Sequence, residues 1–129
     1  MSNITSENYV ENCLRTESEV NDEIISRISK PETLRLLHSA MGISTEAAEL
    51  VDMLKKHIFY GKKIDFPNAT EELGDALWYI GIGVDVLKTT MNEIMSVNIE
   101  KLQARYPEKF SEQNALNRDL KKEREILER

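Results

Sequence analysis

Cysteine, proline and glycine are all scarce in this chain of 129 residues, which holds one cysteine, three prolines and five glycines. The lone Cys13 can form neither an internal disulfide nor a cysteine metal site. Because helix-favouring residues dominate and helix breakers are few, apolar positions are expected to recur with the helical period rather than the strand period. The sequence therefore predicts an all-α fold without a disulfide framework.

Long apolar runs and an excess of basic residues are also missing. No apolar run approaches the roughly 18 residues of a membrane span, and the N-terminal stretch MSNITSENYV lacks the layout of a signal peptide. We therefore expect a cytoplasmic protein with no membrane partner. The 23 acidic residues exceed the 17 basic ones, giving a formal net charge of −6. This balance argues against nucleic-acid binding, which requires concentrated Lys and Arg.

A small phosphorylated substrate is not excluded by the acidic balance. Divalent cations can lie between the oxygens of an acidic site and those of a phosphate group.

Periodic apolar positions and capping residues divide the chain into helices. We predict one or two helices over residues 7–28, and one helix over each of the ranges 31–57, 69–88, 91–105 and 115–128. Ser29, Asn68 and Thr90 have the side chains of N-cap residues, and Glu71 and Glu93 follow two of them at the spacing of a capping box. The last helix has too few apolar residues for a main core element, so we expect it to pack over a neighbour or a partner chain.

Glycines interrupt two of these helices. Gly42 weakens the 31–57 helix by roughly 1 kcal/mol relative to alanine, which allows a local break there. In the 69–88 helix, Gly74, Gly81 and Gly83 are expected to let a neighbouring helix approach closely.

Two predicted helices carry acidic pairs whose members are three residues apart. Glu46 and Glu49 lie in STEAAELVDML, and Glu72 and Asp75 lie in EELGDALWY. Residues at this spacing project from one helix face and can share a ligand. One such pair usually belongs to a solvated face. Two pairs joined by a loop of roughly ten residues can be brought together by antiparallel helices.

Four converging carboxylates repel one another unless cations or protons occupy the site. Ligation by oxygen alone favours hard ions, so we predict Mg²⁺, with Mn²⁺ as a substitute. A di-iron site of the ferritin type would need Glu-x-x-His pairs. Neither His38 nor His57 follows a glutamate by three residues, so the usual di-iron pattern is excluded.

The paired motifs and their flanks resemble the all-α nucleoside triphosphate pyrophosphohydrolases of the MazG-like family. That family builds its site on an E-x-x-E helix, a loop and an E-x-x-D helix, which here are EAAE at 46–49 and ELGD at 72–75. The stretches EAAELVDMLKK, EELGDALWYI and NIEKLQARYPEKF are also similar to the family, over about residues 34–110. The stretch NRDLKKEREILE resembles the tail of phage and bacterial members.

The resemblance implies an antiparallel helical bundle with a four-helix core and extra helices at both ends. We expect one domain over residues 1–129, with its core at about 31–106. A homodimer or homotetramer is also implied, and this agrees with long helices whose apolar faces need cover. The setting would be the cytoplasm, with a phage as a plausible source.

The same resemblance assigns roles to the four carboxylates. Glu46, Glu49, Glu72 and Asp75 would hold the metal and act in catalysis. One of the glutamates would accept the proton of the attacking water, and the sequence leaves open which one.

Two ring-bearing residues can line the same cavity as the carboxylates. Tyr79 lies seven residues after Glu72, and His38 lies eleven residues before Glu49. Each is about 20° off the carboxylate stripe, where it can contact a base or sugar. A core contact is the simpler alternative for both.

Basic and amide side chains are candidates for phosphate contacts. Asn98, Lys101 and Arg105 share a stripe of the 91–105 helix and resemble the family's nucleotide-contacting groups, with Lys as a point charge and Arg as a fork. Three lysines flank the loop before residue 69, of which we assign Lys56 to the triphosphate. A solvated charged face is the simpler alternative.

We therefore predict Mg²⁺-dependent hydrolysis of a nucleoside triphosphate, in particular a dNTP, to the monophosphate and pyrophosphate. Such an enzyme would control nucleotide pools or remove damaged nucleotides. The alternative from another class is a non-catalytic helical regulatory or interaction module on the same scaffold, which would show no stabilisation by metal.

Overall fold

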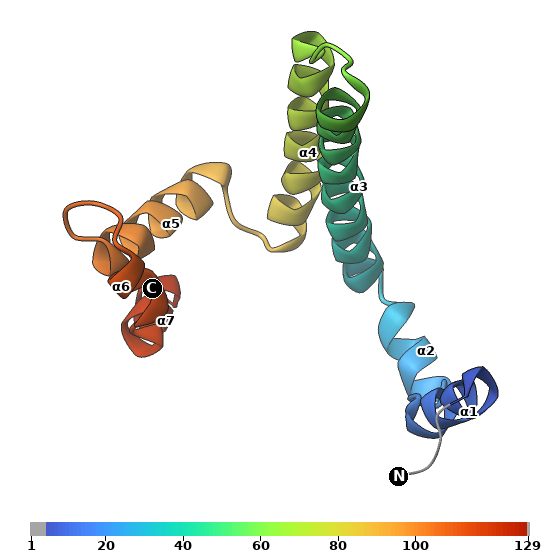
Figure 1. Cartoon of the computed structure of the whole chain (residues 1–129). Coiled ribbons are helices and arrows are strands. Elements are labelled where there is room, and N and C mark those ends of the chain that lie inside the picture. Colours follow the sequence, from blue (N-terminus) through green and yellow to red (C-terminus); the bar gives the residue numbers. More distant parts are fainter. Residues whose placement is uncertain (1–4, 129) are drawn as a thin grey trace. The chain divides into compact units, whose positions relative to one another are not determined.

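The computed structural model describes residues 5–128, and over this range the chain is built of α-helices (Figure 1). The helices are α1 (Ser6–Thr16), α2 (Asp22–Ile28), α3 (Pro31–Tyr60), α4 (Phe66–Val86), α5 (Met91–Arg105), α6 (Glu112–Leu116) and α7 (Leu120–Leu127). No strand occurs within residues 5–128, so the all-α prediction is confirmed. The chain divides into two compact units after Leu34.

The first unit contains α1 and α2, each with its own N-cap. The Thr5 hydroxyl accepts from the Asn8 N–H, and the Asn21 side chain accepts from the Ile24 N–H. Ser29, predicted to cap the following helix, instead ends α2. Its backbone is helical, with φ −76° and ψ −5°, whereas an N-cap residue has an extended backbone. The predicted cap at Ser29 is therefore wrong.

In the second unit, α3 and α4 lie side by side and run antiparallel (Figure 1). Arg35 of α3 forms an ion pair with Asp85 of α4 at 2.6 Å. Further along α3, the Ser39 hydroxyl donates to the main-chain carbonyl of Tyr79 across 2.7 Å. Higher residue numbers on α3 thus pair with lower numbers on α4, which is the antiparallel arrangement that the short connecting loop predicts.

Helix α3 is continuous through Gly42, so the local break that this glycine allows does not occur. Gly42 is buried, and a Cβ added at this position would overlap the Tyr79 ring. The glycine therefore creates the space in which the tyrosine ring packs against α3.

The glycines of α4 differ in their surroundings. A Cβ added at Gly83 would lie 2.9 Å from the Ser39 hydroxyl oxygen, so this glycine does permit close approach of α3. Within the described residues, nothing lies within 4 Å of a Cβ added at Gly74 or Gly81. Of the three glycines predicted to let a helix approach closely, Gly83 does so within the described residues, and Gly74 and Gly81 do not.

Helix α4 begins three residues earlier than predicted, because Asp65 rather than Asn68 is its N-cap. Asp65 has an extended backbone, and its side chain accepts from the Asn68 N–H at 3.1 Å. Pro67 then lies in the first turn, where a missing N–H is harmless. Glu71 is consequently inside the helix, and its predicted capping role is wrong.

The predicted capping box at the start of α5 is confirmed. The Thr90 hydroxyl accepts from the Glu93 N–H at 3.2 Å, and the Glu93 carboxylate accepts from the Thr90 N–H at 2.9 Å.

The helix predicted over residues 115–128 is two helices instead. Ser111 caps α6 and Asp119 caps α7, each by accepting a hydrogen bond from the N–H three residues on. Competing local caps of this kind interrupt a polar stretch that lacks a strong apolar stripe.

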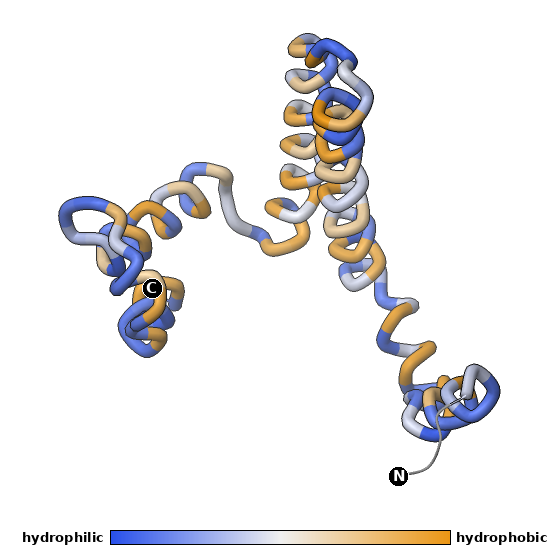
Figure 2. Tube along the Cα trace, viewed as in Figure 1, coloured by the Kyte–Doolittle hydropathy of each residue, from blue (hydrophilic) through white to orange (hydrophobic). Residues whose placement is uncertain are grey.

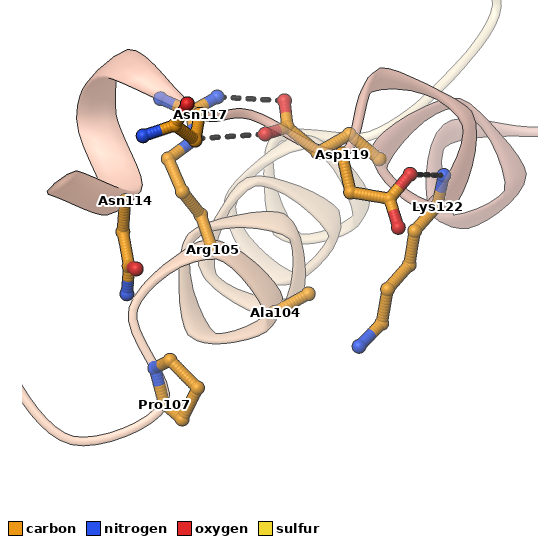
Figure 3. A pocket seen from close by; sticks show the side chains of 8 residues that line it. Ala104, Arg105, Pro107, Asn114, Asn117, Asp119 and Lys122 are labelled. Atoms are coloured by element: carbon orange, nitrogen blue, oxygen red, sulfur yellow. Dashed lines mark hydrogen bonds and ion pairs between the residues drawn. The ribbon is translucent and has the colours of Figure 1, made fainter.

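A buried carboxylate on α7 forms an ion pair with an arginine of α5. Glu123 is 5% exposed, and it accepts hydrogen bonds from Nε and Nη2 of Arg105 at 2.8 and 2.6 Å (Figure 3). Arg118 donates to the same carboxylate at 2.6 Å. Two guanidinium groups thus satisfy one carboxylate, which compensates the cost of burying it.

Large apolar side chains are mostly exposed in the described part of the chain. Among residues 5–128, Ile126 is the one large apolar side chain that is buried. On α4, Leu73 and Leu77 are each 57% exposed and Trp78 is 61% exposed. Figure 2 shows apolar positions along both α3 and α4. No helix within residues 5–128 has the length and apolar character needed to cross a membrane.

Candidate functional site

Three acidic side chains from two helices meet on the α3–α4 pair. Glu46 comes from α3, and Glu72 and Asp75 come from α4. One carboxylate oxygen of each residue lies within 4.8 Å of the others, and these three residues are called the carboxylate cluster below. The antiparallel pairing of the helices and the spacing of the two α4 residues create this convergence.

Burial and neighbouring carboxylates disfavour the ionised form of Glu46 in the cluster. Partial burial raises the pKa of Glu46, and a hydrogen bond shared with Glu72, the negative charge of Glu72 and that of Asp75 add to the increase. The Thr45 hydroxyl donates to Oε1 of Glu46 at 3.4 Å and opposes this increase. Carboxylates in this arrangement favour a proton or a cation between them.

The donor set fits a hard divalent cation. All three cluster residues offer carboxylate oxygens, and the cluster contains no histidine or cysteine. Mg²⁺ and Mn²⁺ are bound through oxygen ligands of this type. Glu46 and Glu72 are half-buried and Asp75 is exposed, so the cluster is accessible to solvent at Asp75.

Asn68 is a site residue that the sequence did not reveal. Its Nδ2 donates to Oε1 of Glu72 at 2.8 Å and thereby orients that carboxylate. Asn68 precedes Glu72 by four residues, and this spacing places both side chains on one face of α4. The spacing could have predicted their contact, but Asn68 was predicted to be the N-cap of the helix instead.

Glu49 lies beside the cluster rather than within it. It follows Glu46 by three residues on α3, is exposed, and lines an adjoining cavity of about 280 Å³. The structure thus brings together three of the four predicted carboxylates, with the fourth at the edge.

Lys56 lines this same cavity. Its ammonium group is 2.5 Å from Asp52, which also pairs with Lys55 at 2.8 Å. Hydrogen bonds from Lys55 and then Lys56 lower the pKa of Asp52 to about 2.

His38 and Tyr79 lie together. Their ring centroids are 5.6 Å apart in an edge-to-face arrangement, and the Trp78 and Tyr79 ring centroids are 5.0 Å apart, also edge-to-face. Tyr79 follows Asp75 by about one helical turn on α4. The two predicted ring-bearing residues are therefore close to each other and next to the cluster.

Asn98, Lys101 and Arg105 lie along α5, as predicted. Asn98 is exposed and lines a cavity of about 450 Å³. Lys101 is half-buried and forms no ion pair with another described residue. Arg105 is bound to Glu123, so its guanidinium is already engaged. None of the hydrogen bonds or ion pairs of residues 5–128 joins these three side chains to the cluster.

A comparison with protein families gives one match, to a model described as the MazG nucleotide pyrophosphohydrolase domain, over residues 36–110. This range covers more than half of the chain and contains every predicted site residue. No curated protein and no solved structure matches the chain.

Proposed function

We propose that this chain, which belongs to the MazG nucleotide pyrophosphohydrolase family, hydrolyses a nucleoside triphosphate to the monophosphate and pyrophosphate with the aid of Mg²⁺ or Mn²⁺. The observation that carries the proposal is the convergence of Glu46, Glu72 and Asp75 from two helices. A dNTP is the proposed substrate, and control or sanitisation of cytoplasmic nucleotide pools is the proposed role.

The reaction exchanges one bond at the α-phosphorus for another. The oxygen of a water molecule bonds to this phosphorus, and the bond from it to the oxygen that bridges to the β-phosphorus breaks. A divalent cation, when bound, offsets phosphate charge and lowers the pKa of the attacking water. Glu46, Glu72 and Asp75 would hold it, with Glu49 beside them.

The protein's own groups supply a base and orientation. One of the glutamates accepts the proton of the attacking water, and pyrophosphate leaves with the bridging oxygen. The hydrogen bond from Asn68 keeps Glu72 directed at the site. Fixed positions of this kind reduce the entropy lost on reaching the transition state.

Contacts with the rest of the substrate come from two groups of side chains. His38 and Tyr79 would contact the base or sugar, because Tyr79 lies about one turn beyond Asp75 on α4 and the His38 ring packs against it. Asn98, Lys101 and Arg105 of α5 would contact the phosphates. For Arg105 this requires exchange of its bond to Glu123 for one to phosphate.

Association into a homodimer or homotetramer belongs to the same proposal. Leu73, Leu77 and Trp78 of α4 are each more than half exposed. Large contiguous apolar surface of this kind usually marks an interface. Four-helix packing of two α3–α4 pairs would cover it.

Release of pyrophosphate from a panel of ribo- and deoxynucleoside triphosphates tests the proposal. We expect metal-dependent release from at least one nucleotide, and a decrease in kcat of at least about hundredfold in Asp75→Asn, since each such ligand supports several kcal/mol of stabilisation. If the wild type released no pyrophosphate from any nucleotide, and metal did not raise its melting temperature, the chain would be a non-catalytic module instead.

A further inference from the structure

We propose that the cavity beside the cluster, at the loop end of α3 and α4, binds the β- and γ-phosphates of the substrate and hence the leaving pyrophosphate. This inference rests on the proposed hydrolysis and adds the direction in which the substrate lies along the helix pair. The cavity is called the lysine cavity below, because Lys56, Lys62 and Lys63 line it.

The size of the lysine cavity suits part of a nucleotide. Its volume is about 280 Å³, which is just below the range of roughly 300–1,000 Å³ found for ligand pockets. A diphosphate fragment is therefore a better match than a complete nucleoside triphosphate.

Two residues connect the lysine cavity to the carboxylate cluster. Asn68 lines the cavity and also donates to Glu72 at 2.8 Å. Glu49 lines the cavity and lies one turn beyond Glu46 on α3. A phosphate chain whose α-phosphate lies at the cluster would therefore extend directly into the cavity.

The loop holds its lysines near the end of α3. Gly61, with φ +66°, ends the helix in the left-handed conformation that glycine tolerates. The Lys62 N–H then donates to the Lys56 carbonyl at 3.3 Å, and Nδ1 of His57 donates to the Lys62 carbonyl at 2.7 Å. These bonds keep the backbone of the first loop lysine next to Lys56.

Two of the lysines that line the cavity have ammonium groups that can contact an anion. Lys62 and Lys63 form no ion pair with any described residue, whereas Lys56 is paired with Asp52. Three carboxylates also line the cavity, those of Glu49, Asp52 and Asp65, and Oδ1 of Asp65 accepts from the Asn68 N–H at the start of α4. The lining is therefore balanced in formal charge, but the ammonium groups of Lys62 and Lys63 are exposed and not held in ion pairs. A polyanion would be attracted to them.

The opposite side of the cluster is chemically different. Tyr79 lies one turn beyond Asp75 on α4 and contacts His38. Rings suit a base or sugar, and ammonium groups suit phosphate. The substrate would therefore lie with its nucleoside toward Tyr79 and its terminal phosphates toward the loop, so that the broken bond falls at the cluster.

The test compares Lys62→Ala/Lys63→Ala with a variant that loses the same charge elsewhere, Lys109→Ala/Lys121→Ala. Lys109 and Lys121 are both exposed, and neither lines the lysine cavity. Calorimetric titration with pyrophosphate and with a nucleoside monophosphate, each with Mg²⁺, measures the two halves of the site separately and requires no turnover.

We expect the loop variant to raise the Kd of pyrophosphate about tenfold, a change of roughly 1.4 kcal/mol. In the loop variant, the Kd of the monophosphate should change less than about twofold. The control variant should bind both ligands like the wild type. The variant Lys62→Arg/Lys63→Arg keeps both positive charges and should retain pyrophosphate binding. An unchanged pyrophosphate Kd in the loop variant, or an equal loss for both ligands, would overturn the inference.

Failure of the subsite and failure of the proposed function give different results. An enzyme that hydrolyses nucleotides but binds pyrophosphate equally well in wild type and loop variant refutes only the lysine cavity. A chain that hydrolyses none of the nucleotides but loses pyrophosphate binding in the loop variant refutes the hydrolysis and leaves a diphosphate-binding cavity.

Discussion

Asn68 and Glu72 are joined by a hydrogen bond of 2.8 Å between two side chains one turn apart on α4. This bond links the first turn of the helix to the carboxylate cluster. Glu72 would otherwise be free to rotate away from Glu46, because side-chain torsions at a half-exposed position interconvert readily. The position of the cluster oxygens therefore depends on a residue that would not itself bind metal.

Replacement of Asn68 by alanine tests this dependence. We expect the Mg²⁺ concentration needed for half-maximal activity to rise about 10- to 100-fold, which is the usual cost of removing a partner that orients a metal ligand. Activity measured over a range of Mg²⁺ concentrations gives this half-maximal value. The control is Thr70→Ala, since the Thr70 hydroxyl donates to the Phe66 carbonyl and, among residues 5–128, has no hydrogen bond to the cluster. Equal metal dependence in Asn68→Ala and wild type would contradict the proposed orientation.

Glu49 and Asp75 are expected to differ in how much each supports metal binding. The Asp75 oxygen is within 4.8 Å of those of Glu46 and Glu72, whereas Glu49 is outside the cluster. We expect Mg²⁺ to raise the melting temperature of Glu49→Gln more than that of Asp75→Asn, while both variants lose activity. Thermal melting with and without Mg²⁺ measures this. Equal loss of the Mg²⁺ effect would instead indicate a site made of all four carboxylates.

Much of the helix pair that carries the site could be predicted from the sequence. The spacing of Glu72 and Asp75 places them on one face, and the short loop before α4 makes the antiparallel pairing the simplest arrangement. Both features are local in the chain, and the structure contains both. The family match over residues 36–110 agrees with the motifs from which the resemblance was drawn.

Other features could not be predicted because they depend on competition or on distant contacts. Asp65 and Asn68 are both good N-cap residues, and only the backbone of the folded loop decides between them. The bond from Arg105 to Glu123 joins residues 18 positions apart and belongs to no local pattern. Gly42 similarly looks like a weak point in a helix until the ring of Tyr79 is placed against it.

Gly42→Ala tests the contact between α3 and the tyrosine ring. The added methyl group would overlap Tyr79, and overpacking of this kind costs about 1–3 kcal/mol, against a gain of up to about 1 kcal/mol in helix propensity. We expect a net loss of unfolding free energy in denaturant titration. The control is Ser44→Ala, which changes an exposed residue of the same helix whose hydroxyl donates to the Ala40 carbonyl, and it should be neutral or stabilising. Equal stabilisation by both substitutions would contradict the proposed packing.

The ion pairs of Glu123 should make the packing of α7 on α5 sensitive to acid. Hydrogen bonds from Arg105 and then Arg118 lower the pKa of Glu123 from 4.5 to about 2. A carboxyl whose pKa is lower in the folded state stabilises that state above its unfolded pKa, and the stabilisation is lost as the pH falls. We therefore expect it to be fully present above about pH 4.5 and to disappear between pH 4.5 and 2.

Glu123→Gln should remove this part of the acid sensitivity while lowering the melting temperature at pH 7, because two arginines lose their charged partner. Melting curves of wild type and variant at pH 7, 4.5 and 3 measure both effects. The control is Glu125→Gln, which changes an exposed residue of the same helix and should leave the acid profile unchanged. The difference in melting temperature between wild type and Glu123→Gln should shrink as the pH falls through this range. A difference that stays constant from pH 7 to 3 would mean that the carboxylate charge of Glu123 does not stabilise the contact between α5 and α7.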